Sequence, residues 1–384
     1  MKTVALITWA TGENYGTSLQ CFAMQKVISS EYICAAVNYE PRFDGVIKKL
    51  LRSPFKTART AFIRRISRLC GTFPLVYEKQ EKRHARFLQF RKNFFNLTAR
   101  YVSCEELTGL NGQFDAFVCG SDQIWNPFGF NSHYFLDFVK NSSKKIAYAS
   151  SFGTENIESS KNAEKIISLV RDFAFLACRE ESGAAWLSQK TGKKVPCVLD
   201  PTLLLKKDDW QKIANDDYKR PAHYIFCYFL GHNEEYLKTV FTFAKSRGLA
   251  VVLIPIYKKD FSRKCIIPND VGPSEFISLV EQAEFVCTDS FHGCCFSVLF
   301  EKPFAPFLRF SNNDKKSQNV RVIDFLEKVG LRNLFFSTEN DLEHIFATKI
   351  NYAAVNAWLE VERQKSLSYL ENALSVATGE VDDV

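Results

Sequence analysis

The sequence predicts an α/β protein of two domains that face each other across a cleft. Three observations predict this fold class. The chain of 384 residues is too long for a single ordinary core. Short apolar segments alternate with helical ones, which is typical of parallel sheets covered by helices on both faces. A charged stretch, "KKDDWQKIANDDYKRP" at 206–221, interrupts the alternation, and the same pattern restarts after it.

The first half opens with an apolar strand at 4–10, a glycine-containing loop, a helix at about 18–30 and a strand at 34–39. This order is typical of a β–α–β unit. Further short apolar strands follow, with helical segments between them. Strands are expected at 114–120, 144–153, 173–180 and 194–201, and helices at 158–171 and 180–190.

The second half repeats this pattern. Strands are expected at 224–231, 249–256, 284–289 and 302–307, and helices at 233–247, 273–283, 292–300, 317–331 and 352–374. The predicted parts of the chain are an N-terminal domain at 1–205, a C-terminal domain at 206–350, and a helix and tail at 351–384. Ligands of open parallel sheets bind where the strands end, so polar residues at those ends are the candidate site.

Residues 43–100 read as a basic helical insertion in the first domain. From 42 to 100 the chain holds sixteen lysines and arginines against three acids, within a net charge of +7 for the whole. Apolar residues at helical spacing in "FKTARTAFIRRISRL" and in "EKRHARFLQFRKNFF" predict two basic helices. Because the charge is confined to this segment, no nucleic acid partner is indicated. Three roles of this basic segment stay open. It could be a solvated face, it could contact an anionic membrane peripherally, or it could pack in an oligomer of unknown size.

The twelve cysteines are scattered and show neither CxxC nor another metal-ligand spacing. Several lie in apolar runs, which favours buried free thiols in a reducing compartment. No metal site is predicted. No apolar stretch approaches the roughly 18–20 residues that cross a bilayer, and the apolar part of the N-terminus is too short for a signal peptide. We expect a cytoplasmic protein.

The loop "GENYGTS" after the first strand is the first candidate site. Gly12 and Gly16 allow a tight turn and a close approach of the backbone to a ligand, with Asn14 between them. The helix that follows could hold an anion at its N-terminus. The alternative is an ordinary turn between a strand and a helix.

The stretch "CGSDQIWNP" at 119–127 is the densest group of polar residues at a strand end. A tryptophan beside amide and carboxylate groups suits a sugar ring, which has an apolar face and hydroxyl edges. In the alternative reading, the tryptophan packs on the core and the aspartate caps a turn. The candidate residues are Gly120, Ser121, Asp122, Gln123, Trp125 and Asn126.

Arg179 follows a buried strand and suits a phosphate or carboxylate, although pairing with Glu180 is an equal alternative. Asp200, which precedes a proline, is interpreted as structural.

His292 lies at the end of a strand and at the start of a helix, in "EFVCTDSFHGCCFSVLF". A helix N-terminus attracts anions and disfavours a charged imidazole, so the protonation of His292 would depend on a nearby anion. Gly293 would let the backbone pass close to a ligand, and Asp289 or Ser290 could cap the helix or orient the histidine. The alternative is a half-buried, satisfied histidine. We interpret His292 as a catalytic acid or base.

The chain resembles the polysaccharide pyruvyl transferase family. The resemblance rests on an ordered set of motifs that spans most of the sequence. They are "NYG" at 14–16, "CGSDQIWNP" at 119–127, "IAYASSFG" at 146–153, "CREESG" at 178–183, "VLDPTLLL" at 198–205, "GPSEFISLV" at 272–280 and "TDSFHG" at 288–293.

This resemblance implies two Rossmann-like domains facing a cleft, as in GT-B glycosyltransferases. It implies transfer of pyruvate from phosphoenolpyruvate, a donor substrate rather than a cofactor, to a saccharide or lipid-linked oligosaccharide. The product would be a ketal on two hydroxyls, in surface or capsular polysaccharide synthesis at the inner face of the membrane. The chain departs from the family at Ser290, where members often carry an arginine; Arg309 and Arg321 are candidates to supply that charge.

Two other functions stay open. A GT-B glycosyltransferase that uses a nucleotide sugar would need an acid for the ribose, and Glu275 in "GPSEF" is a candidate. A non-catalytic saccharide-binding relative would fit the absence of the family arginine.

Overall fold

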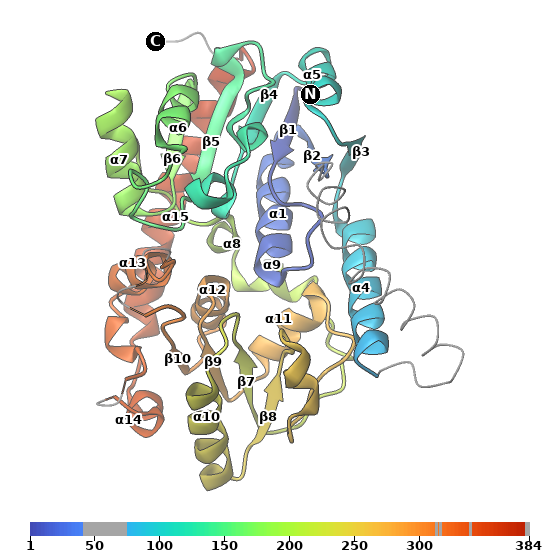
Figure 1. Cartoon of the computed structure of the whole chain (residues 1–384), viewed down its shortest axis with the longest axis vertical. Coiled ribbons are helices and arrows are strands. Elements are labelled where there is room, and N and C mark those ends of the chain that lie inside the picture. Colours follow the sequence, from blue (N-terminus) through green and yellow to red (C-terminus); the bar gives the residue numbers. More distant parts are fainter. Residues whose placement is uncertain (41–74, 312–313, 315–316, 338–339, 381–384) are drawn as a thin grey trace.

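The computed structural model describes residues 1–40, 75–311, 314, 317–337 and 340–380, and shows two α/β domains stacked along the long axis of the molecule (Figure 1). The first sheet has six parallel strands in the order β3-β2-β1-β4-β5-β6, and the second has four in the order β10-β9-β7-β8. The predicted fold class is confirmed.

Near-continuous apolar runs form the strands because both faces of each sheet are covered. The sequences "AFVC" of β4 and "YIFCY" of β7, for example, are buried at every position. The strands of the first sheet are β1 (Thr3–Ile7), β2 (Ile33–Tyr39), β3 (Leu97–Tyr101), β4 (Ala116–Cys119), β5 (Lys145–Ser150) and β6 (Phe175–Cys178). Those of the second are β7 (Tyr224–Tyr228), β8 (Ala250–Leu253), β9 (Phe285–Thr288) and β10 (Phe304–Pro306).

Helices follow most strands, as the alternating pattern predicts. In the first domain they are α1 (Tyr15–Ile28), α4 (Leu75–Phe94), α5 (Cys104–Thr108), α6 (Ala163–Val170) and α7 (Glu181–Thr191). The segment between the sheets forms α8 (Pro201–Leu204) and α9 (Lys207–Gln211). The rest are α10 (Glu234–Arg247), α11 (Pro273–Glu281), α12 (Phe291–Leu299), α13 (Val320–Lys328), α14 (Leu342–Ala347) and α15 (Tyr352–Ala377).

Two predicted elements are wrong. Residues 194–201 do not form a strand but an isolated bridge between Cys197 and Cys178, after which α8 begins. Pro196 and Pro201 lack the N–H groups that a full ladder needs, which explains the difference. The proposed insertion at 43–100 also extends too far, because β3 is an edge strand of the first sheet.

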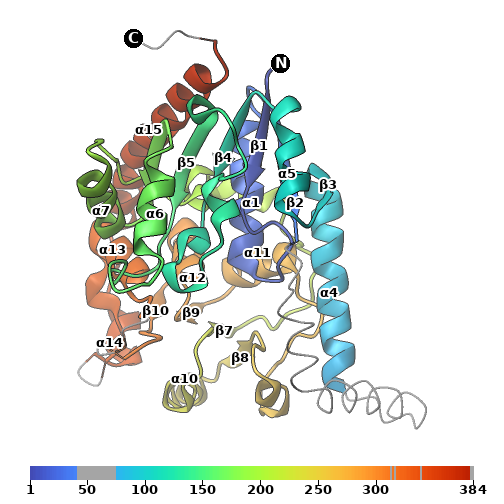
Figure 2. The ribbon, with the colours of Figure 1, turned by 45° about the horizontal axis from the view of Figure 1, so that its top comes forward.

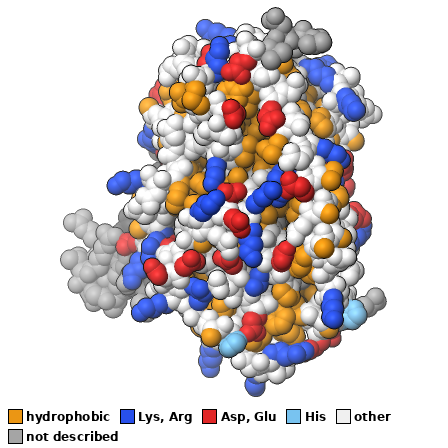
Figure 3. Space-filling model, turned by 180° about the vertical axis from the view of Figure 1, so that it is seen from behind, with side chains coloured by type: hydrophobic (Ala, Val, Ile, Leu, Met, Phe, Trp, Pro, Cys, Tyr) orange, Lys and Arg blue, Asp and Glu red, His pale blue; other side chains and the backbone are white. Residues whose placement is uncertain are grey.

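Of the two predicted basic helices, the second is confirmed as part of α4, and the first, at 55–69, lies outside the described residues. Arginines of α4 bind backbone carbonyls of both domains. Arg91 donates to Thr11 O, while Arg83 donates to Glu13 O at 2.8 Å and to Pro255 O at 3.2 Å. These charges therefore join the two domains. On the face in Figure 3, basic and acidic side chains are interspersed.

Helix α15 returns from the second domain and packs on the first sheet (Figures 1 and 2). The Tyr369 hydroxyl donates to Ala147 O on β5 at 3.1 Å, and Ser366 Oγ accepts from Leu199 N at 3.0 Å. The helix predicted at 352–374 is thus confirmed, and it ties the two domains together.

The domains meet where α1 and α8 pack against α11 and α12. The Tyr15 ring of α1 stacks on Phe276 of α11, with centroids 4.8 Å apart, and its hydroxyl donates to Val271 O at 3.1 Å. One apolar core runs through this contact from the first domain into the second. The carboxyl ends of the two sheets are therefore held face to face.

Candidate active site between the two domains

His292 lies at this contact, in the first turn of α12 and directly after β9. Ser290 caps the helix, its Oγ accepting from Gly293 N at 3.4 Å. The His292 side chain is almost fully buried. The structure thus places His292 at the strand end and helix start that the sequence indicates.

The first domain surrounds the His292 ring. Its Nε2 lies 3.4 Å from Asp200 Oδ2, at the N-terminus of α8. On its other side the ring packs on Gly16 of α1, where an added Cβ would lie 2.0 Å from His292 Nδ1. Gly16 is thus required because the histidine of the opposite domain occupies the space of a side chain.

We expect Gly16→Ala to displace His292, with a loss of stability of about 1–3 kcal/mol from overpacking and a loss of activity. Gly12→Ala is the matched control, because no atom lies within 4 Å of the Cβ it would add. Unfolding midpoints and turnover of both variants check this prediction. Equal behaviour of the two variants would contradict it.

Arg179 is held between three acidic side chains. Its Nη1 donates to Asp200 Oδ2 at 2.6 Å, and its Nη2 lies 3.6 Å from Asp122 Oδ1. Its Nε lies 3.4 Å from Glu180 Oε1, and all four side chains are buried. Burial would raise the pKa of Asp200, but the charges of His292 and Arg179 outweigh it and hold that pKa well below its usual range. Asp200 is therefore an anion that lies between Arg179 and His292.

Arg321 of α13 brings a further buried positive charge to the same region. Its guanidinium lies against the side-chain amide of Gln123, whose oxygen can accept from Arg321 Nε at 2.8 Å. Burial and the neighbouring charges of Arg179 and Arg309 lower the pKa of Arg321 to about 9. Guanidinium groups stay charged in proteins, so the lowered pKa shows that the region disfavours one more cation. A bound anion would relieve this cost.

Arg309 contacts Asp289, which immediately precedes the N-cap of α12. Its Nη2 donates to Asp289 O at 3.1 Å, and its Nε lies 3.5 Å from Asp289 Oδ2. The Asp289 carboxylate accepts from Leu230 N at 2.6 Å and Gly231 N at 2.7 Å, which fixes it in place. Asp289 thus positions Arg309 and is not free for a ligand.

Three buried nitrogens of this region have no hydrogen-bond partner in the part of the chain that the structure describes: Arg179 Nη2, His292 Nε2 and Arg309 Nε. Each lies 3.4 to 3.6 Å from a carboxylate oxygen without forming a hydrogen bond to it. Buried polar groups are normally bonded, and leaving one unpaired costs about 1–3 kcal/mol. An anionic ligand would satisfy the unpaired nitrogens of the two arginines, and that of the histidine when it carries a proton.

Trp125 does not lie in this site, contrary to the prediction. Its ring is fully buried and stacks on Phe135, with centroids 5.0 Å apart. Its Nε1 donates to Tyr134 O at 2.9 Å. The indole packs among apolar rings in the core of the first domain, so its faces are covered and no sugar can stack on it.

Several other predicted residues serve as helix caps. The side chains of Asn14 and Asn126 accept from Thr17 N at 3.1 Å and Phe128 N at 3.0 Å. Glu275 accepts from Gly272 N at 2.8 Å, at the start of α11. Its other oxygen accepts from Asn215 Nδ2 at 2.9 Å. Both oxygens of Glu275 are therefore used within the protein, which argues against a role in binding ribose.

Gly120 and Gly293 are glycines for reasons of packing. A Cβ on Gly293 would lie 2.3 Å from Thr288 Oγ1, and one on Gly120 would lie 1.9 Å from Tyr148 O. Ser121, after a cis peptide bond, donates through Oγ to Ala149 O at 2.9 Å and to Asp200 Oδ2 at 3.2 Å. Ser121 thus belongs to the hydrogen bonds that hold Asp200.

Three residues of the site were not among the candidates. Asp200, interpreted as structural, faces His292. Thr17 donates from Oγ1 to Asp122 Oδ2 at 2.7 Å, and the Phe291 ring lies 4.3 Å from the Arg179 guanidinium carbon. Asp200 was recognised at the end of a predicted strand, and it was interpreted as structural, although the structure places it against His292.

Two facing Rossmann-like domains with a buried ionic site between them define a GT-B-like protein, as predicted. Solved structures agree on the fold. A putative UDP-N-acetylglucosamine 2-epimerase from Listeria monocytogenes has a TM-score of 0.55 at 11% identity, with coverage of 100% of this chain and 98% of that chain. The UDP-N-acetylglucosamine 2-epimerase from Rickettsia bellii has a TM-score of 0.56 at 10% identity, covering 97% and 96%.

The corresponding epimerase from Neisseria meningitidis, bound to UDP-GlcNAc, has a TM-score of 0.50 at 9% identity, covering 96% and 100%. Structural similarity at such low sequence identity establishes the fold of the chain but not its function. The family model of polysaccharide pyruvyl transferase, in contrast, matches residues 14–312. The chain belongs to the polysaccharide pyruvyl transferase family, which is a family of enzymes. No curated protein matches the chain.

Proposed function

We propose that this enzyme transfers a pyruvyl group from phosphoenolpyruvate to a saccharide, forming a ketal, in the synthesis of a surface or capsular polysaccharide. The observation that carries this proposal is the set of three unpartnered, buried nitrogens on Arg179, His292 and Arg309. Phosphoenolpyruvate carries a phosphate and a carboxylate, and such groups bind arginine strongly through charge-assisted hydrogen bonds.

Arg309 and Arg321 fit the role of the arginine that members of the family often carry at the position of Ser290. Both lie close enough to Arg179 or to each other for their charges to interact. A cavity of about 30 Å³, lined in part by Arg179, Phe291 and Arg321, remains beside the site. The unpaired nitrogens themselves are buried at the contact between the domains, so we expect the domains to part when the donor enters.

His292 is suited to move the protons of the reaction. Formation of a ketal joins two saccharide oxygens to the central carbon of phosphoenolpyruvate and breaks the bond from that carbon to the phosphate oxygen. The two hydroxyls lose two protons: one ends on the methylene carbon, which becomes a methyl group, and one leaves with inorganic phosphate. A histidine can carry the first of these protons. Asp200, 3.4 Å from Nε2, would stabilise the imidazolium that forms.

Replacing Arg321 by methionine should cost the unliganded protein less than the roughly 3–5 kcal/mol of a broken buried ion pair, because Arg321 bonds the side-chain amides of Gln123 and Gln318 and not a carboxylate of the described residues. The increase in melting temperature caused by phosphoenolpyruvate should be lost in the same variant. Thermal unfolding with and without the donor measures both effects. Arg247→Met is the control, since Arg247 is exposed and pairs with Glu343 outside the site. An increase in melting temperature by phosphoenolpyruvate that persists in Arg321→Met would contradict this assignment.

A phosphate-release assay tests the proposed reaction. The enzyme is incubated with phosphoenolpyruvate and a panel of saccharides and lipid-linked oligosaccharides, and in parallel with sugar nucleotides. We expect release of inorganic phosphate only when phosphoenolpyruvate and an acceptor are both present. Release of a nucleotide from a sugar nucleotide, without phosphate release, would favour the glycosyltransferase alternative. Saccharide binding without any turnover would favour a non-catalytic relative.

A lipid-linked acceptor would place the enzyme at the inner face of the cytoplasmic membrane, and the proposal includes peripheral contact there. No helix in the described parts of the chain is long and apolar enough to cross a membrane. Since Arg83 and Arg91 bind the protein itself, this contact would depend on other basic residues. Co-sedimentation with anionic liposomes should weaken as salt rises; binding indifferent to both salt and lipid charge would contradict the contact.

A further inference from the structure

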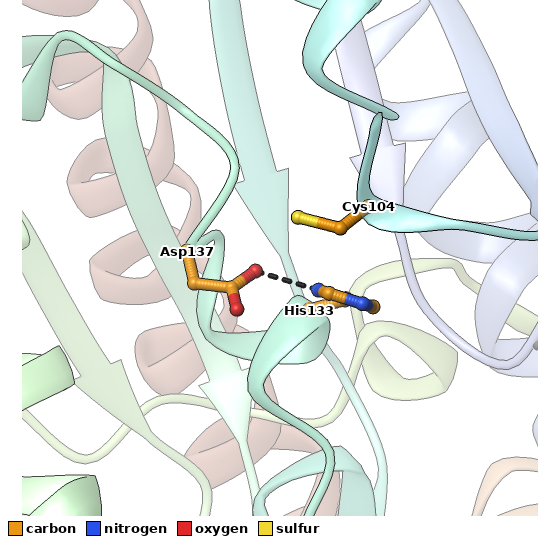
Figure 4. Close-up of side chains that lie close together, drawn as sticks. All are labelled: Cys104, His133 and Asp137. Atoms are coloured by element: carbon orange, nitrogen blue, oxygen red, sulfur yellow. Dashed lines mark hydrogen bonds and ion pairs between the residues drawn. The ribbon is translucent and has the colours of Figure 1, made fainter. Parts of the chain in front are cut away.

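A second group of reactive side chains lies in the first domain and is not used by the proposed reaction. It consists of Cys104, His133 and Asp137 (Figure 4). One ligand atom from each side chain lies within 4.8 Å of the other two. His133 Nδ1 is 2.7 Å from Asp137 Oδ1, and the Cys104 thiol lies beside this pair.

Two separate elements supply these side chains. Cys104 is the first residue of α5, shortly after the edge strand β3. His133 belongs to the 3-10 helix η4 (Ser132–Phe135), and Asp137 follows it. Leu136, between them, has the left-handed conformation with φ 54° and ψ 36°, which turns the chain and returns Asp137 to the side of His133.

The surroundings keep the three side chains ordered and reachable. Asn131 Oδ1 accepts from His133 N at 3.0 Å and fixes the start of η4. The Tyr39 ring packs edge-on against the His133 ring, with centroids 5.4 Å apart. The His133 and Asp137 side chains are 18% and 22% exposed, so an ion could enter while most of the shell stays protected.

A thiolate, an imidazole and a carboxylate together form a ligand set typical of zinc. Ligands at about 2.0–2.3 Å from a tetrahedral ion lie roughly 3.5 Å from one another. To reach that spacing the widest pair would close by at most about 1.3 Å, and His133 Nδ1 and Asp137 Oδ1, now 2.7 Å apart, would separate by about 0.8 Å. Both changes are within the reach of small side-chain rotations. Three protein ligands leave the fourth position of a tetrahedral ion open to water or to another ligand.

We propose that Cys104, His133 and Asp137 bind a zinc-like divalent cation. The ion ties α5 to η4 across the edge of the first domain and keeps one coordination position open. Cys104 and His133 are far apart in the sequence and form no local ligand motif, which explains why the spacing of the cysteines predicts no metal site.

Cobalt(II) is a direct probe because its absorption reports the ligands. The full chain, purified without a polyhistidine tag and stripped with a chelator, is titrated with Co²⁺ and then with Zn²⁺. We expect one Co²⁺ per chain, visible ligand-field bands of a tetrahedral ion, and a near-ultraviolet thiolate charge-transfer band; Zn²⁺ should remove all of these signals by displacement.

Variants assign the ligands. Cys104→Ser should abolish the thiolate band and weaken binding at least about tenfold, and His133→Ala should weaken binding to a similar extent. Cys265→Ser is the control, because Cys265 is also partly buried but lies outside the group. A thiolate band that persists in Cys104→Ser would overturn the proposal. So would wild-type protein that shows no saturable Co²⁺ signal, since the group would then be a His–Asp pair beside a thiol.

Discussion

His292→Ala should slow phosphate release from phosphoenolpyruvate by about 10²–10⁴-fold, the usual contribution of a general acid or base. The side chain is the imidazole at the contact between the domains, with Asp200 3.4 Å away. Rates under saturating donor and acceptor measure the effect, and the melting temperature of each variant shows whether the fold is kept.

His223→Ala is the matched control for this experiment. His223 is exposed and pairs with Glu284, outside the site. We expect its turnover to match that of the wild type. If His292→Ala kept turnover within a few-fold of the wild type while remaining folded, His292 would not be the proton carrier.

Arg179→Met should lower the free energy of unfolding by about 3–5 kcal/mol, because removing one partner leaves buried charges without compensation. Arg179 is the cation that Asp122, Glu180 and Asp200 share. The substitution should weaken the contact between the domains as well as the site, because the same network holds Asp200 near His292 of the other domain.

Urea unfolding at neutral pH measures this difference. Arg100→Met is the control: Arg100 is exposed and pairs with Glu40, and exposed pairs contribute about 0–1 kcal/mol. If Arg179→Met cost no more than Arg100→Met, the buried network would not stabilise the fold. Adding Asp200→Asn to Arg179→Met should restore part of the loss, because one uncompensated carboxylate is removed.

Much of the fold follows from the sequence, since a strand buried on both faces is a local pattern of apolar residues. The runs that become β4 and β7 are apolar at every position. The prediction fails at 194–201, where an apolar pattern alone suggests a strand but Pro196 and Pro201 prevent a ladder.

The candidate site was harder to predict because its contacts join distant segments. The position of His292 follows from its own neighbours, but its partners Asp200 and Gly16 are set by how the domains meet. Gly16 lies in a glycine-containing loop after a strand, which suggested that a ligand approaches its backbone. In the structure the side chain of His292 occupies that space. The polar residues next to Trp125 suggested that its ring stacks on a sugar. Its place in the core is set by aromatic rings from other parts of the chain.

Calorimetric titration of phosphoenolpyruvate tests the central claim most directly, because it requires no knowledge of the acceptor. The claim is that the unpaired donors between the domains bind an anionic donor substrate. We predict one binding site per chain in the wild type, affinity at least about tenfold lower in Arg309→Gln, and wild-type affinity in the exposed control Arg247→Gln. Absence of binding to the wild type, or equal affinity in Arg309→Gln and the wild type, would contradict the claim.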